Sequence, residues 1–93
     1  MSEKAEQVWP YFGVPPPRQP RPAAEEPSLP GKRVVLSTPE GFIYDMRAVS
    51  RVYRDKSGRQ LVDIVSDEDY FRWMLIQHSP VATPYSVTLV WVE

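Results

Sequence analysis

The 93-residue sequence has no cysteine, only one histidine and only four glycines, which lie far apart from one another. Without cysteine the chain can form neither a disulfide nor a Cys-based zinc site, and it has no thiol nucleophile. Separated glycines cannot form a phosphate-binding loop, and no serine lies in a Gly-x-Ser-x-Gly elbow. His78 comes at the end of a predicted helix, where the helix dipole favours a cationic group. We therefore expect a non-enzymatic protein without a cofactor, a metal or a small-molecule substrate.

Long apolar runs are also missing from the sequence. No run approaches the roughly 20 residues needed to span a bilayer, and residues 1–30 lack the apolar segment of a secretory signal. A cytoplasmic location without a membrane partner is the expectation. The formal net charge of −1 argues against bulk electrostatic affinity for nucleic acid. Residues 18–59 nevertheless carry nine basic and five acidic side chains, whereas residues 60–93 carry one and five, so the positive charge is concentrated in the middle of the chain.

Proline, in contrast, is abundant, and eight of the eleven prolines lie between Pro10 and Pro30. Because proline fixes φ and has no amide donor, this density predicts an extended arm over residues 1–31. Residues 32–93 then form a single small domain. A domain of about 60 residues buries only about 60% of its unfolded surface, so it gains stability by dimerising, by binding a partner or by packing its own tail.

The pattern of residues 32–93 predicts a small α+β domain with an antiparallel sheet and the element order β-β-β-α-β. Strands are expected over 32–37, 42–54, 60–65 and 85–92, and a helix over 67–77. Turn sequences between the first three strands favour hairpins, and the long second strand needs a bulge or bend near Val49 and Ser50. An open sheet and a partly closed SH3-like barrel both fit this order, and the open sheet is preferred.

The spacing of apolar residues predicts which faces are buried. The even positions of the second strand, from Phe42 to Ala48, point to the core. Ser66 is expected to cap the helix, whose first turn is acidic. Apolar residues then surround most of the helix, among them Phe71 and Trp73. Such a helix is expected to be buried or covered by another surface.

The arm contains two patterns that are typical of protein interaction. An aromatic cluster, Trp9, Tyr11 and Phe12, lies near its start, and the segment from Pro17 to Pro20 has the Pro-x-x-Pro spacing of polyproline ligands. A semi-rigid linker is the preferred interpretation of residues 15–30, but exposed aromatics add nothing to a linker. We expect the cluster to pack on the chain's own domain, on another protein or on a second copy of the chain.

These patterns favour a protein-interaction or adaptor module whose partner is another protein or a second copy of the chain. Its contact residues are predicted in the arm and on the helix: Trp9, Tyr11, Phe12, Pro17, Arg18, Pro20, Phe71, Trp73 and Met74.

The alternative is a nucleic-acid-associated accessory protein that uses basic and aromatic side chains around the second hairpin: Arg47, Arg51, Tyr53, Arg54, Lys56 and Arg59. Solubilising charge on an exposed sheet is the simpler explanation of these residues, so protein binding is preferred.

Overall fold

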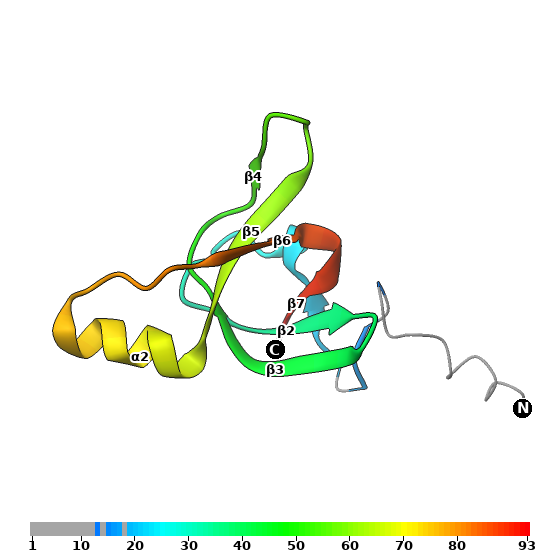
Figure 1. Ribbon diagram of the computed structural model, residues 1–93. Helices are drawn as coiled ribbons and strands as arrows, with labels where there is room; N and C mark the ends of the chain where they lie inside the picture. The colour runs from blue at the N-terminus through cyan, green and yellow to red at the C-terminus, as the bar shows by residue number, and fades with distance from the viewer. Residues whose placement is uncertain (1–12, 14, 18) are drawn as a thin grey trace, which may run out of the picture.

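An antiparallel sheet that curls on itself and one helix form a small α+β domain in the computed structural model, which describes residue 13, residues 15–17 and residues 19–93 (Figure 1). The strands in this part of the chain are β1 (Arg21–Pro22), β2 (Arg33–Thr38), β3 (Gly41–Ala48), β4 (Tyr53–Arg54), β5 (Gln60–Ser66), β6 (Thr83–Ser86) and β7 (Val90–Val92). The helix α2 spans Asp67–Ile76. Two short 3₁₀ helices, η1 (Ala23–Glu25) and η2 (Val87–Leu89), follow β1 and precede β7.

The strand order is β1-β7-β2-β3-β5-β4, and β6 pairs with the other edge of β5. β3 and β4 are two halves of one bent segment, because both pair with the same edge of β5. The second strand predicted over 42–54 is therefore interrupted over 49–52, where a bend was expected. The last strand predicted over 85–92 is also divided, since η2 separates β6 from β7. This division lets the chain leave β5 and pair with β2.

A bulge in β3 lies closer to its start than the sequence predicts. Val34 of β2 lies opposite Met46, but Leu36 lies opposite Ile43, so β3 contains one residue more than β2 between these pairs. Asp45 takes up the extra length in a left-handed conformation with φ of 61°. An aspartate tolerates this conformation better than most side chains, and bulges of this kind bend a strand sharply.

The early bulge reverses the orientation of the residues that precede it. Met46 and Ala48 face the core as predicted. Phe42 and Tyr44 were expected on the same side, but the register places them on the outer face of the sheet with Val35. The prediction of a core-facing Phe42 and Tyr44 is therefore wrong, because the pairing with β2 shifts the alternation before Met46.

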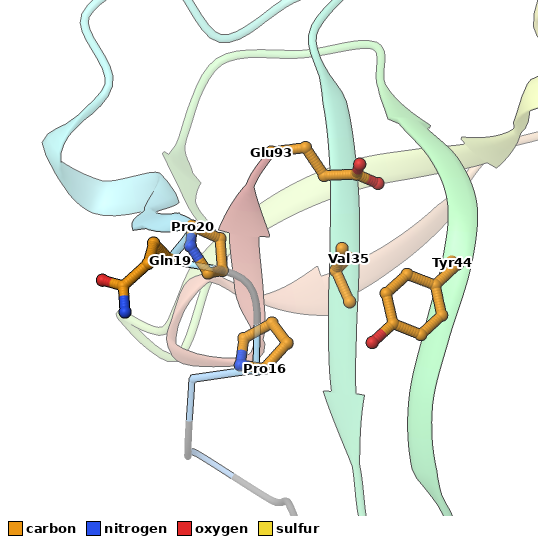
Figure 2. A pocket seen from close by; sticks show the side chains of 6 residues that line it. All are labelled: Pro16, Gln19, Pro20, Val35, Tyr44 and Glu93. Carbon is orange, nitrogen blue, oxygen red and sulfur yellow. The ribbon is translucent and has the colours of Figure 1, made fainter.

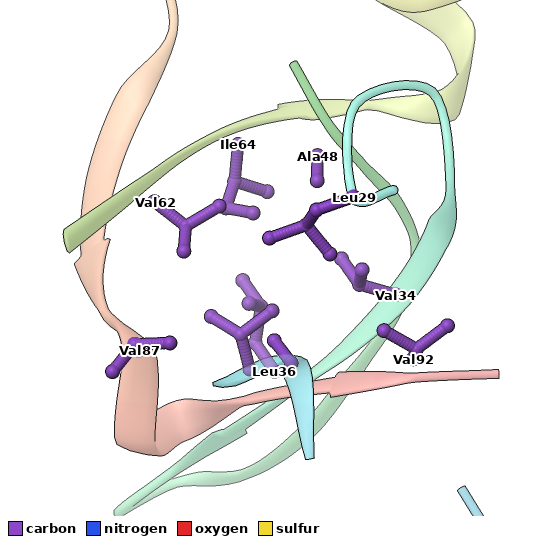
Figure 3. Packing of buried hydrophobic residues seen from close by; sticks show 10 residues of the cluster. Leu29, Val34, Leu36, Ala48, Val62, Ile64, Val87 and Val92 are labelled. Carbon is purple, nitrogen blue, oxygen red and sulfur yellow. The ribbon is translucent and has the colours of Figure 1, made fainter. Parts of the chain in front are cut away.

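The core lies inside the curl of the sheet and consists of small aliphatic side chains (Figure 3). Its buried residues are Ala23, Leu29, Val34, Leu36, Ala48, Val62, Ile64, Val87, Val90 and Val92. Ala23 and Leu29 belong to the segment that the sequence alone places in the arm. β1 pairs with β7, and the Gly31 amide donates to the carbonyl of Ala48 at 2.7 Å. The last part of the proline-rich segment therefore packs with the sheet.

The helix α2 begins where the sequence predicts, because Ser66 accepts a hydrogen bond from the amide of Asp69 at 3.0 Å. It ends at Gln77, whose left-handed backbone lets its amide donate to the carbonyl of Trp73. The helix leaves the end of β5 and projects beyond the sheet (Figure 1). None of its ten residues is buried by the described part of the chain, so the sheet does not provide the cover expected for an apolar helix. Among the described residues, no helix has the length and apolarity needed to cross a bilayer.

Candidate interaction surfaces

The most exposed large apolar side chains of the described residues gather on α2 and shortly after it. Phe71, Met74, Leu75 and Ile76 are 50%, 55%, 83% and 58% exposed, and Val81 is 95% exposed. Phe71, Met74 and Leu75 lie on one side of the helix, because residues three and four apart are neighbours there. We call these three residues the helix patch. Ile76 points to another side of the helix, where it lines a groove together with Val81.

The helix patch contains two of the three helix residues predicted to contact a partner, Phe71 and Met74. Trp73 is half-buried and packs edge-on against Tyr70, with ring centroids 6.1 Å apart. Leu75, Ile76 and Val81 were not selected from the sequence. The spacing of apolar residues could not have identified them, because the helix is apolar on most sides. Which side is exposed depends on where the sheet lies.

Arg47 fixes the base of α2 to the sheet. Its Nε donates to Asp67 at 2.6 Å, and its Nη1 donates to the carbonyl of Gly31 at 3.0 Å. Its guanidinium also lies over the rings of Tyr70 and Phe71, at 5.1 and 5.0 Å from their centroids. Such a cation is attracted to the electron-rich ring faces. The side chain predicted as a nucleic-acid contact thus joins β3, the end of the arm and the helix to one another.

A groove of about 240 Å³ lies between α2 and residues 78–81, beside the helix patch. Trp73, Ile76 and Val81 are among its apolar lining, and His78 is exposed at the same groove. His78 was expected to interact with the carbonyls at the helix end. In the structure the side-chain amide of Gln77 donates to one of them, the carbonyl of Met74, at 3.4 Å.

The basic side chains of the second hairpin have several partners within the hairpin itself. Arg54 donates to the carbonyl of Gly58 at 2.9 Å, and Arg59 donates to Asp55 at 3.0 Å. The other predicted cations are also exposed, Arg51 before β4 and Lys56 in the loop between β4 and β5. The cluster is therefore partly used to build the hairpin.

The aromatic residue of the predicted nucleic-acid surface is also engaged. The Tyr53 hydroxyl donates to Asp63 at 2.5 Å, which raises the pKa of Tyr53. The residue is 37% exposed. Its hydroxyl is thus fixed to β5 while part of the side chain stays accessible to solvent.

Asp55 organises the loop of this hairpin, as its position before Gly58 predicts. Its Oδ1 accepts from the hydroxyl of Ser57 at 2.7 Å, from the Ser57 amide at 2.9 Å and from the Arg59 amide at 3.0 Å. These bonds, the Ser57 hydroxyl foremost, lower the pKa of Asp55 from 3.8 to about 2. Gly58 supplies the left-handed conformation with φ of 89°.

A second cavity lies where the arm crosses the outer face of the sheet. It has a volume of about 410 Å³ and is lined by Pro16, Gln19, Pro20, Val35, Tyr44 and Glu93, which we call the arm cavity. Figure 2 shows the two prolines on one side of it and Tyr44 beside Val35 on the other.

The predicted contacts in the arm divide between this cavity and solvent. Pro20 is half-buried at the cavity, whereas Pro17 is exposed. The remaining predicted contacts, Trp9, Tyr11, Phe12 and Arg18, lie outside the described residues.

Two polar side-chain atoms near β2 and β7 are buried without a hydrogen-bond partner among the described residues. They are Oγ of Ser37 and Nε1 of Trp91. Trp91 pairs with Val35 and Ser37 pairs with Phe42, so both side chains lie on the sheet's outer face, as do Val35 and Tyr44 of the arm cavity. Buried polar atoms without a partner are rare. This face of the sheet is therefore more deeply covered than an ordinary exposed sheet surface.

A comparison of the chain with known protein families, with curated proteins and with solved structures finds no match. The described residues contain no group of three or more histidine or acidic side chains arranged to hold a metal ion.

Proposed function

We propose that this protein is a non-enzymatic protein-interaction module and that the helix patch is its principal contact surface. The supporting observation is a ten-residue helix with no buried residue and with four apolar side chains at least half exposed. An isolated helix shorter than about 12–15 residues is marginal in water, and most helical stability in proteins comes from packing of an apolar face. The helix therefore gains most of its stability when another surface covers the patch.

The proposed occupant is a second copy of the chain. In a two-fold dimer the same surface of both chains forms the interface. An unpaired charged side chain in that surface would therefore face the identical charge of the second chain. The helix has one cation, Arg72, which is paired with Glu68 at 3.2 Å and with Asp69 at 3.1 Å. The helix patch itself is apolar and uncharged. It therefore offers no like-charge repulsion to an identical helix.

The size of the patch fits a reversible dimer. Full burial of a large apolar side chain contributes roughly 1.5–3 kcal/mol, so covering the exposed parts of the three side chains of the patch contributes up to about 5 kcal/mol per chain. Two chains contribute about 10 kcal/mol, and association costs at least about 4 kcal/mol. The balance corresponds to a dissociation constant of about 10–100 μM.

A change of Leu75 tests this interface, because Leu75 is the most exposed large apolar residue of the helix and contributes little to the fold. Leu75→Glu places two carboxylates in the two-fold interface, so we expect dimerisation to weaken by at least about tenfold. Sedimentation equilibrium of the full chain over about 5 μM to 1 mM measures this change. Gln60→Glu is the matched control, because it adds the same charge at an exposed position of β5. Equal dissociation constants for both variants would contradict the proposed interface.

The strand order supports a finer description of the fold as a partly closed SH3-like barrel. β7, β2, β3, β5 and β6 follow one another around the curl, the second of the long strands is bent, and a 3₁₀ turn precedes the last strand. We propose this description in place of the open sheet. Small barrels of this kind host many functions, so the interaction role depends on the helix patch and not on the fold.

The arm is the second proposed contact region.

Nucleic-acid binding is the alternative proposal, and the charge of the second hairpin favours it. Residues 51–59 carry four cations, Arg51, Arg54, Lys56 and Arg59, against a single anion, Asp55. If this surface follows a phosphate backbone, single-stranded oligonucleotides bind at low salt and dissociate steeply as salt rises. A gel shift in about 20 mM salt measures this. Lys56→Glu weakens the shift if the alternative holds, and the absence of any shift for the wild-type chain rejects it.

A further inference from the structure

The arm cavity is an apolar site with hydrogen-bond acceptors among its lining residues. Pro16, Pro20, Val35 and Tyr44 supply its apolar lining. Gln19 and Glu93 also line it, and the Glu93 carboxylate and the Gln19 carbonyl oxygen can each accept a hydrogen bond. Its volume of about 410 Å³ lies within the range of cavities that enclose a small ligand. The site therefore suits an aromatic group that carries a donor, such as an indole or a phenol.

The same chain carries such groups immediately before the cavity. Phe12 lies four residues before Pro16, and Trp9 lies seven residues before it. A chain spans at most about 3.3–3.6 Å per residue, so Phe12 lies within about 14 Å of Pro16 and Trp9 within about 25 Å. A tether of this length keeps the aromatic segment near the cavity at all times. The aromatic segment can therefore reach the cavity with little entropic cost.

We propose that the arm cavity is the docking site for the aromatic segment 9–12 of the same chain. One or more of the rings of Trp9, Tyr11 and Phe12 pack between the prolines and the outer face of the sheet, against Val35 and Tyr44. The indole or phenol donor pairs with Glu93 or Gln19. Docking in this way buries aromatic surface that a linker would leave in water, and it adds a layer to a small domain whose core consists of aliphatic side chains.

Double-mutant cycles between the arm aromatics and Tyr44 of the cavity test the proposal in the full-length chain. Trp9→Ala, Tyr11→Ala and Phe12→Ala each remove one ring, and Tyr44→Ala removes one wall of the cavity. At least one arm substitution is expected to lower the melting temperature by roughly 4–8 °C. That loss becomes clearly smaller in the Tyr44→Ala background, because the two residues share one contact. Asp55→Ala, in the loop between β4 and β5, is the control and is expected to be additive with Tyr44→Ala.

A second measurement identifies the occupant directly. Nuclear Overhauser contacts between the aromatic protons of residues 9–12 and the methyl groups of Val35 are expected in uniformly labelled protein. The Leu75→Glu variant is measured in parallel, so that loss of the helix interface and loss of arm docking are distinguished. Contacts seen only between differently labelled copies would overturn docking within one chain. The proposal would also be overturned if Trp9→Ala, Tyr11→Ala and Phe12→Ala were each fully additive with Tyr44→Ala.

Discussion

At the scale of single residues, Asp55 shows how one carboxylate holds a loop together. It accepts three hydrogen bonds at Oδ1 and one from Arg59 at Oδ2, all within the loop that it closes. The sequence predicts this arrangement, because an aspartate three residues before a glycine is typical of such turns. The local chain alone determines it, so no knowledge of the rest of the fold is needed.

The depressed pKa of Asp55 predicts how stability depends on acid. The folded pKa of about 2 lies below the ordinary value of 3.8, so the carboxylate stabilises the fold above pH 4, and this contribution is lost as pH falls towards 2. Asp55→Ala removes this contribution. The free energy of unfolding of the variant is therefore lower than that of the wild type at pH 7, and it changes less between pH 4 and pH 2. Urea unfolding at several pH values measures both effects.

Asp55→Asn serves as the control for the acid prediction, because its amide oxygen still accepts hydrogen bonds but does not titrate. Some acid dependence remains in every variant, since Arg21 also lowers the pKa of Glu26. An Asp55→Ala protein that keeps the full wild-type slope between pH 4 and pH 2 would contradict this account.

At the scale of elements, α2 is attached at its base and free along most of its length. Arg47 makes the attachment through Asp67, Gly31 and the two aromatic rings beside it. Arg47→Ala leaves the half-buried Asp67 carboxylate without this partner, so we expect the free energy of unfolding to fall by about 2–3 kcal/mol.

The same substitution is expected to reduce helix content more than sheet content, which circular dichroism measures. Arg51→Ala is the matched control, because Arg51 is exposed, and its stability is expected to change by less than about 0.5 kcal/mol. A helix signal that is equally strong in both variants would show that α2 does not depend on Arg47.

Short-range sequence patterns predict some of these elements and miss others. The start of α2, the two hairpins and the bend after β3 follow from short-range patterns, and all are present. The bulge at Asp45 was missed, because it depends on the pairing of β3 with β2 and leaves no mark in the alternation of β3 alone. β1 and the core residues Ala23 and Leu29 were missed for a similar reason. Their proline-rich surroundings hide contacts that only the returning strand β7 creates.

The sequence also predicts some residues of the candidate surfaces and misses others. The apolar character of α2 predicts a helix that is buried or covered by another surface, but no part of the described chain buries it, and Phe71 and Met74 are exposed. The position of Leu75 on its free side depends on how Arg47 orients the helix, which no local pattern reveals. The arm cavity was missed, because the reversed orientation of Tyr44 creates one of its walls.

At the scale of the whole molecule, two apolar surfaces lie on different parts of a small fold. The helix patch is exposed on α2, and we propose that it contacts a second copy of the chain. The arm cavity lies on the outer face of the sheet, and we propose that it holds the chain's own aromatic segment. A dimer formed through α2 would carry two second hairpins and two arms, which is an arrangement suited to an adaptor.

Sedimentation equilibrium of the wild-type chain measures directly whether the helix patch joins two copies, through the weight-average mass. Our account predicts that the mass rises with concentration from that of one chain towards that of two, with a dissociation constant of about 10–100 μM. A mass that stays at one chain up to about 1 mM would contradict self-association through the helix patch.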